Sequence, residues 1–183
     1  MAWYRNLSRR EFIKTAAAAA VAGGVGCASR KNPWRFFWVH EARTLAAMCD
    51  CLIPPDSDPG AEWAEVVNYI DIQLCAPYRK LRNLYREGIA NLELTSQRRF
   101  NKAFSALPID AQTLLLQDLE KGTAPKEIWT SLSPSQFFET VLAHTMQGYY
   151  GDPRHGGNRE RTSWKMLGLV CPPIRGRVRV IEG

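Results

Sequence analysis

The spacing of apolar residues constrains the fold most, because it favours helices along nearly the whole chain. Leu45, Met48 and Leu52 recur at helical spacing, so we expect a helix over roughly 40–53. Pro54-Pro55 begins a turn-rich stretch, which should end this helix. The further helices predicted by the same spacing run from Trp63 to Leu74, from Pro77 to Leu92, from Phe100 to Leu107, from Pro108 to Leu119 and from Ser133 to Thr145.

Strand-like alternation occurs only in the C-terminal tail, where Val178 and Val180 alternate with Arg177 and Arg179. No heptad pattern is sustained, which argues against a coiled coil. The predicted fold class is therefore all-α: an irregular helical bundle with a long glycine-rich C-terminal loop and an extended tail. We expect a single helical domain over 40–183.

The first 27 residues have the pattern of an export signal and are not expected to belong to the fold. Arg9 and Arg10 are followed by Phe12 and Lys14, and then by a weakly hydrophobic run of Ala and Gly. This pattern is typical of a twin-arginine (Tat) signal, which directs proteins that have already folded in the cytoplasm. The alternative is an Ala-rich amphipathic helix with a chance Arg pair.

Two cleavage sites for this signal are compatible with the sequence. Ala20-Val21-Ala22 has the small-x-small form that signal peptidase accepts. The stretch from Gly24 to Cys27 resembles a lipobox, in which Cys27 would be acylated. The aromatic linker over 28–39 follows, and it either packs on the body or contacts a partner or a membrane interface.

The charge distribution argues against nucleic-acid binding. The net charge is +6, of which residues 1–27 contribute +3. Much of the remainder lies in the tail at Arg175, Arg177 and Arg179. No stretch of about 18 apolar residues occurs outside the N-terminus, so we expect no transmembrane span in the mature chain.

The segment 148–164 is the most distinctive part of the C-terminal third. It contains four glycines within the eleven residues 148–158. It lacks the Lys-Ser/Thr ending of a phosphate loop and the preceding strand of a dinucleotide fingerprint. It is either a packed loop that closes the bundle or a docking surface for a partner. The residues that we expect at a partner interface are Tyr149, Tyr150, Asp152, Pro153, Arg154, Gly156, Gly157, Asn158 and Trp164.

The segment from Thr145 to Pro153, with Gly156-Gly157-Asn158 and Trp164 after it, resembles the C-terminal signature of the gluconate 2-dehydrogenase subunit 3 family. The stretches from Leu45 to Pro54 and from Val67 to Leu74 resemble that family as well. The resemblance covers most of residues 40–170. His155 stands where the family pattern has an aromatic residue such as Tyr.

This resemblance implies a non-catalytic small subunit of a periplasmic, membrane-associated dehydrogenase complex that oxidises gluconate, other sugars or alcohols. It implies that a large subunit binds FAD and oxidises the substrate, that a third subunit with haem c takes the electrons, and that this chain holds no cofactor. The small subunit would escort the large one through Tat export, stabilise it and associate with the cytoplasmic membrane.

Candidate catalytic and metal-ligating residues are sparse. His40, His144 and His155 are not arranged in a His-x-x-x-His or Glu-x-x-His pattern. Neither a Gly-x-Ser-x-Gly elbow nor a Cys-x-x-Cys-His haem motif occurs. We therefore predict no catalytic, cofactor or metal residue. Two alternatives stay open: a stand-alone periplasmic enzyme that uses Asp152, Arg154 and His155, and a lipid-anchored structural protein.

If Cys27 is acylated or removed with the signal, four cysteines remain in the exported chain: Cys49, Cys51, Cys75 and Cys171. Cys49 and Cys51 point about 200° apart on a helix, so they would not easily share one partner. Buried free thiols, two disulfides and a metal site are all compatible with this number of cysteines.

Overall fold

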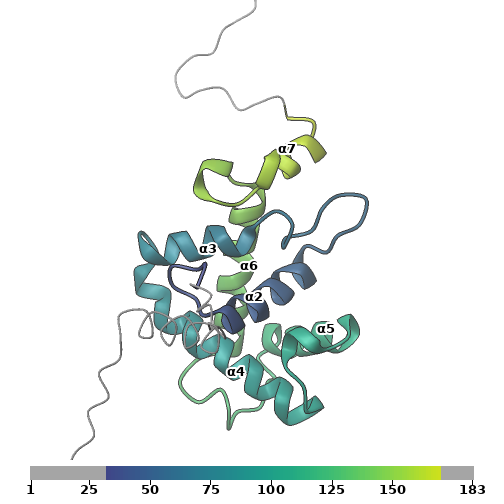
Figure 1. Cartoon of the computed structure of the whole chain (residues 1–183). Helices are drawn as coiled ribbons and strands as arrows, with labels where there is room; N and C mark the ends of the chain where they lie inside the picture. Colours follow the sequence, from purple (N-terminus) through teal and green to yellow (C-terminus); the bar gives the residue numbers. More distant parts are fainter. Residues whose placement is uncertain (1–31, 170–183) are drawn as a thin grey trace, which may run out of the picture. The chain divides into compact units, whose positions relative to one another are not determined.

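The computed structural model describes residues 32–169, which form helices and turns and contain no strand (Figure 1). The longer helices are α2 (Val39–Leu52), α3 (Val66–Cys75), α4 (Arg82–Phe100), α5 (Ile109–Glu120) and α6 (Pro134–Tyr150). The short elements are η1 (Arg79–Leu81), η2 (Phe104–Ala106), η3 (Pro153–His155), η4 (Arg159–Arg161) and α7 (Thr162–Met166). The prediction of an all-α fold is confirmed.

Several expected features lie outside the described residues. They are the signal residues Arg9, Arg10, Phe12 and Lys14, the acylation candidate Cys27, the tail cysteine Cys171 and the extended tail. The boundary at 27 therefore stays a prediction, whereas Val39, the last residue of the predicted linker, is already the first residue of α2.

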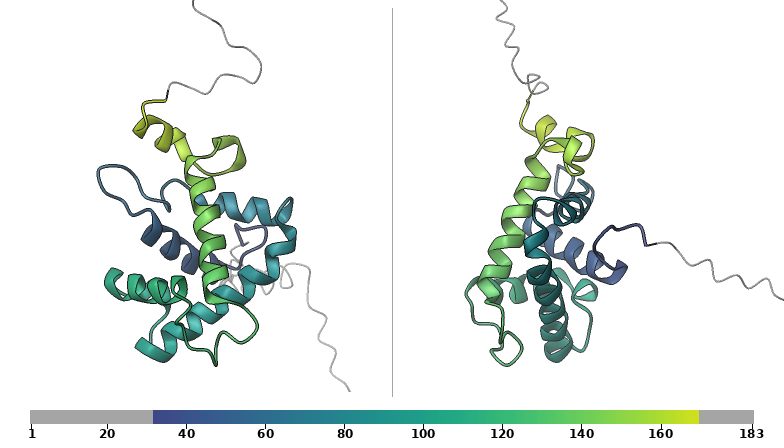
Figure 2. Two further views of the ribbon diagram at one scale, coloured as in Figure 1. Left: turned by 180° about the vertical axis from the view of Figure 1, so that it is seen from behind. Right: turned by 90° about the vertical axis from the view of Figure 1, so that its left-hand side faces the viewer.

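Helix α6 is the central element of the described body, since it contacts α2, α3, α4, α5 and α7. The left view of Figure 2 shows it running down the middle of the body, with α2 and α5 on one side and α3 on the other. Phe137, Val141, Thr145 and Tyr149 recur every four residues along it and are all buried, which is the pattern of a helix face in a core. Gly88 lets α4 approach this face, because a Cβ there would overlap the ring of Phe137.

The predicted helix over 100–107 is wrong. Phe100 is the last residue of α4, and Asn101 follows in the left-handed conformation with φ 53°. Asn tolerates this conformation better than other non-glycine residues, so it ends the helix as a glycine would. Only the 3-10 turn η2 lies between α4 and α5.

Helix starts follow their local capping chemistry. The Ser133 hydroxyl accepts the N–H of Gln136 at 3.4 Å, and Pro134 is the first residue of α6, as the sequence pattern predicts.

Trp63 lies outside the helix that it was expected to begin. Glu65 has φ 58° and Val66 donates to the carbonyl of Ala61, so a separate turn precedes α3.

The expected long loop over 148–164 is mostly helical. Gly148 to Tyr150 form the last turn of α6, and η3, η4 and α7 follow in close succession. Gly156 separates η3 from η4 with φ 98°, a value that few residues with a side chain adopt. The compact stretch 151–169 is hereafter the C-terminal cap. The structure therefore does not show the predicted long glycine-rich loop in these residues.

The aromatic arm Asn32–Trp38 packs on the body. Phe37 is fully buried, and the Asp71 carboxylate of α3 accepts the backbone N–H groups of Arg35, Phe36 and Phe37 at 2.7, 2.9 and 3.1 Å. The Arg86 guanidinium donates to the Phe36 carbonyl at 2.6 Å and lies over the Phe36 ring. The described part of the linker is thus held by specific contacts.

Candidate functional site

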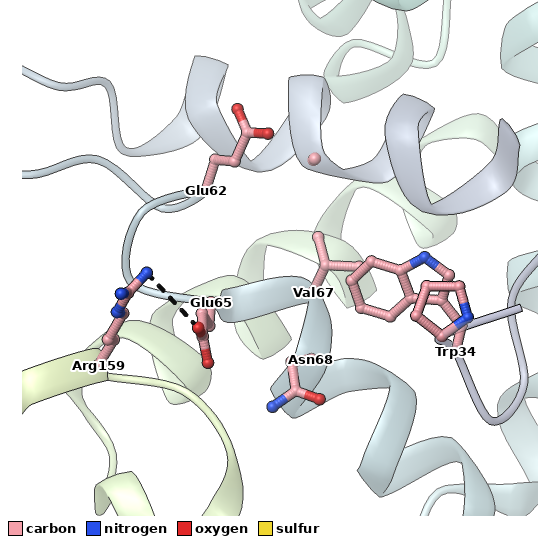
Figure 3. Close-up of a pocket in the computed structure, with 8 residues that line it drawn as sticks. Trp34, Glu62, Glu65, Val67, Asn68 and Arg159 are labelled. Atoms are coloured by element: carbon pink, nitrogen blue, oxygen red, sulfur yellow. Dashed lines mark ion pairs between the residues drawn. The ribbon is translucent and has the colours of Figure 1, made fainter. Parts of the chain in front are cut away.

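A groove of about 480 Å³ opens between the arm, α2, the start of α3 and η4 (Figure 3). Its lining residues are Pro33, Trp34, Ala46, Glu62, Glu65, Val67, Asn68 and Arg159. Figure 3 shows Trp34 and Val67 together on one side, whereas Glu65 and Arg159 lie on the other. The groove therefore combines an aromatic and aliphatic wall with a charged rim. The sequence could not indicate it, because its residues come from segments more than a hundred positions apart.

Arg159 ties the C-terminal cap to the start of α3. Its guanidinium lies 3.6 Å from the Glu65 carboxylate and 5.1 Å from the centre of the Trp63 ring. Its backbone N–H donates to the Ala64 carbonyl at 3.2 Å. Because both charged side chains are about half exposed, the ion pair itself contributes little stability, at most about 1 kcal/mol. The contacts of Arg159 therefore serve mainly to position the C-terminal cap against the start of α3, and they add little to the free energy of unfolding.

Asn158 holds the cap together from inside. It is fully buried, its amide donates to the Gly151 carbonyl at 2.8 Å, and its side-chain oxygen accepts the N–H of Ser163 at 3.1 Å. Gly157 is in close contact with the Gly148 backbone, and any Cβ there would overlap the Gly148 carbonyl. Both residues therefore determine the shape of the cap and do not lie on its surface.

Tyr149 is also an internal residue. Its side chain is 2% exposed, and its hydroxyl donates to the Pro59 carbonyl at 2.7 Å. Burial raises the pKa of this phenol, so it stays protonated and keeps the bond. The sequence analysis predicted Tyr149 and Asn158 at a partner interface. In this structure both side chains are buried inside the subunit.

The remaining predicted interface residues lie at or near the surface of the cap. Arg154 forms two bonds to one Asp152 oxygen, at 2.9 and 2.6 Å, and this guanidinium holds the pKa of Asp152 at about 2. The Trp164 indole donates to the backbone carbonyl of Tyr150 at 3.0 Å. Tyr150 is 36% exposed and Trp164 is half-buried. Tyr150 is the last residue of α6, and Asp152, Arg154 and Trp164 lie in the C-terminal cap that follows it. Pro153 and Gly156 lie between them in the sequence.

A buried aromatic network joins α3, α4 and α6. The Tyr85 hydroxyl lies 2.8 Å from Nδ1 of His144, and the Tyr78 ring stacks on the His144 ring at 4.4 Å. Tyr69 and Tyr78 both donate to the Gln147 side-chain oxygen, at 3.1 and 2.9 Å. Burial lowers the pKa of His144 and raises that of Tyr85, so a neutral imidazole and a neutral phenol share this hydrogen bond. His144 is therefore a buried residue of the core.

The described cysteines are free thiols. Cys49 is buried with its sulfur 3.3 Å from the Thr145 hydroxyl, and Cys51 donates to the Gln112 side-chain oxygen at 3.2 Å. Burial raises their pKa values, to about 12 for Cys49 and about 11 for Cys51, so neither is a reactive thiolate near neutral pH. Within residues 32–169 no group of three or more His, Cys, Asp or Glu side chains is placed to hold a metal ion.

The family model of gluconate 2-dehydrogenase subunit 3 matches residues 39–170. The chain belongs to the gluconate 2-dehydrogenase subunit 3 family. The match covers all of α2 to α7, and it confirms the resemblance carried by Thr145 to Pro153 and by Trp164. No curated protein and no solved structure matches the chain significantly.

The family model of twin-arginine translocation signal sequences matches residues 6–26 of this chain. It includes Arg9 and Arg10, and it supports export across the cytoplasmic membrane to the periplasm. None of the helices in the described part of the chain is long and apolar enough to span a bilayer. Family and signal together support an exported subunit of a dehydrogenase complex.

Proposed function

We propose that this subunit is a non-catalytic escort, which carries a folded FAD-binding dehydrogenase subunit through the Tat pathway and stabilises it afterwards. One observation carries the proposal: a twin-arginine signal at 6–26 and a dehydrogenase-subunit domain at 39–170 are present on one chain. Because Tat substrates cross the membrane folded, a large subunit without its own signal can cross while bound to this one.

Binding is the mechanism in this proposal. Tyr150, Asp152, Arg154 and Trp164 would contact the large subunit, since aromatic and Arg side chains are common anchors of protein interfaces. Gly157 and Asn158 would act indirectly, by holding the cap in shape. FAD would belong to the large subunit and haem c to a third, cytochrome subunit, and the assembled complex would associate with the cytoplasmic membrane.

Export of the partner tests this escort role. In cells that carry the whole complex, the double variant Arg9→Lys/Arg10→Lys should abolish transport of both subunits. The measurement is protein-bound flavin in the periplasmic fraction, together with the protein that co-purifies with a tagged subunit. Arg5→Lys is the matched control, because it keeps the pair and changes a basic residue just before the matched signal.

Two results would contradict the escort role. One is undiminished periplasmic flavoprotein in the Arg9→Lys/Arg10→Lys variant. The other is dehydrogenase turnover by the purified subunit alone, which would favour a stand-alone enzyme.

A further inference from the structure

We propose that the groove between the arm, α2, α3 and η4 binds a basic segment of the dehydrogenase subunit, with a Lys or Arg side chain of that subunit lying in it. The proposal rests on the proposed escort function and deepens it, because it names a second contact with the same partner and the chemistry of the segment that the groove accepts. The side chains of the proposed escort contact do not line the groove; they are Tyr150, Asp152, Arg154 and Trp164.

The polar side of the groove presents oxygen atoms that can accept further hydrogen bonds. The Glu62 carboxylate forms no hydrogen bond or ion pair with any other described residue, and Figure 3 shows it apart from the pair of Glu65 with Arg159. The Asn68 amide donates to the Gly156 carbonyl at 2.8 Å, so the side-chain oxygen of Asn68 is left to accept another donor. Acceptors of this kind suit a cation with several N–H groups, which a guanidinium or an ammonium provides.

The one described Arg of the groove does not make it a site for an anion. The Arg159 guanidinium already lies 3.6 Å from the Glu65 carboxylate and over the Trp63 ring. An incoming carboxylate would compete with Glu65 and would also meet the like charge of Glu62, which lines the same groove. The groove therefore favours a positively charged occupant.

The chain around the groove is acidic. Residues 50–65 contain five acidic side chains and no basic one, in a chain whose net charge is +6. The five are Asp50, Asp56, Asp58, Glu62 and Glu65. The Asp50 carboxylate accepts the backbone N–H of Glu62 at 2.7 Å, so its charge lies next to the groove. Such a stretch attracts a basic segment of a partner and repels an acidic one.

The opposite side of the groove suits the aliphatic stem of a Lys or Arg side chain. Trp34 and Val67 lie together there (Figure 3). Long basic side chains bury their methylene groups on apolar surfaces and place their cationic ends against aromatic rings. The same combination occurs inside this subunit, where the Arg86 guanidinium lies 4.4 Å from the centre of the Phe36 ring and pairs with the Glu41 carboxylate. The groove offers these two kinds of contact to a cation of the partner.

The walls of the groove are fixed by bonds within the subunit. The arm that carries Trp34 is held on α3 by Asp71, whose carboxylate accepts the N–H of Arg35 at 2.7 Å. On the other side, Arg159 donates its backbone N–H to the Ala64 carbonyl at 3.2 Å. A preformed groove binds with a smaller loss of conformational entropy than a surface that must first be ordered. Its volume of about 480 Å³ lies within the range of ligand sites.

Photo-cross-linking from the rim of the groove tests the proposal. Pro33→p-benzoylphenylalanine places the photoreactive group at an exposed lining position and keeps both glutamates. Pro108→p-benzoylphenylalanine, at the exposed start of α5, is the matched control. The complex is purified from the periplasmic fraction through a tag on this subunit and irradiated, and the linked peptides are identified by mass spectrometry. We expect the probe at Pro33 to capture a segment of the flavoprotein that contains Lys or Arg, and the probe at Pro108 not to capture it.

Two variants measure the charge preference. Glu62→Lys places a like charge against the basic segment, and Ala46→Arg fills the groove with a cation of its own. Each should raise the Kd for the flavoprotein about tenfold or more, measured by the flavin fluorescence that the immobilised subunit retains. Glu139→Lys and Ala90→Arg are the same substitutions at exposed positions of α6 and α4, and they should bind as the parent does. Circular dichroism should give Glu62→Lys the melting temperature of the parent, so this variant decides the outcome if Ala46→Arg melts lower.

Other outcomes would overturn the inference. Unchanged flavoprotein binding by Glu62→Lys, or a segment captured from Pro33 that contains neither Lys nor Arg, removes the basic occupant. A flavoprotein that co-purifies with the parent but is not captured from Pro33 removes the groove contact and leaves the escort role intact. Failure of any flavoprotein to co-purify with the parent contradicts the escort role itself, which the Arg9→Lys/Arg10→Lys experiment tests separately.

Discussion

The buried carboxylate of Asp71 accepts the backbone N–H of Phe37 at 3.1 Å and thereby fixes the arm to α3. The same carboxylate also accepts the N–H groups of Arg35 and Phe36. Three consecutive backbone donors on one charged acceptor make strong, charge-assisted bonds. The arm is thus fixed to the body at Arg35, Phe36 and Phe37.

Asp71→Asn should destabilise the fold by about 2 kcal/mol, because a neutral amide accepts fewer and weaker bonds from the arm. Urea unfolding followed by circular dichroism measures this change. Glu139→Gln, which neutralises an exposed acid on α6, is the control and should change stability by less than about 0.5 kcal/mol. Equal stability of the two variants would show that the arm is not held by the carboxylate.

Gly88→Ala should lower the free energy of unfolding by about 2 kcal/mol, although Ala is ordinarily the better helix former, because its Cβ would overlap the Phe137 ring. A double-mutant cycle isolates the overlap: in a Phe137→Leu background the same substitution should cost at least about 1 kcal/mol less. An identical cost in both backgrounds would contradict close packing of α4 on Phe137.

Tyr149→Phe should cost about 1 kcal/mol of stability, because it leaves the Pro59 carbonyl without its hydroxyl donor. Tyr150→Phe, at the neighbouring exposed position, should be close to neutral. Thermal unfolding of the two variants compares them directly. The reverse order of stabilities would mean that Tyr149 is not the internal member of the pair.

Tyr150→Ala should weaken binding of the dehydrogenase subunit by about 2 kcal/mol, or about thirtyfold in Kd, if Tyr150 and the exposed residues of the cap form the escort interface. The substitution keeps the backbone carbonyl that accepts from Trp164, so the cap should stay intact. Recovery of protein-bound flavin with a tagged subunit reports the effect, and Leu114→Ala on α5 is the control. Full recovery with Tyr150→Ala would exclude this residue from the interface.

Lowering the pH below about 6.5 should destabilise the fold through His144. Burial holds its pKa below the ordinary histidine value of about 6.5, so the unfolded chain takes up a proton before the folded chain does as the pH falls. This part of the stability is fully present above 6.5 and is lost as the pH falls toward the lowered pKa. His144→Asn should show a shallower decline in stability between pH 7 and 5 than the parent chain in urea titrations. An equally steep decline in the variant would contradict this role of His144.

Helices whose signals are local were predictable from the sequence. The apolar spacing of Leu45 and Met48 predicts α2, and Ser133 with Pro134 predicts the start of α6. The helix expected over 100–107 does not form because Asn101 adopts a left-handed conformation, which apolar spacing does not reveal.

The site was less accessible to such reasoning, because its contacts join distant segments. Tyr85 and His144 lie 59 positions apart and meet only when α4 packs on α6. Tyr149 and Tyr150 are neighbours with the same side chain, yet one is buried and the other is exposed. Only the direction of the last turn of α6 distinguishes them, and composition carries no information about it.

The contacts of Asn158 bear on how this subunit can be handled in the laboratory. The side chain of Asn158 is hydrogen-bonded to the Gly151 carbonyl and to the Ser163 N–H. A chain that ends with α6 would lose these bonds and the packing of Gly157 on Gly148. A stop codon placed before Asn158 should therefore give an aggregating product, whereas an affinity tag appended to Gly183 is separated from the last described helix by more than a dozen residues. The end of the chain is the place for a label, and the cap is not.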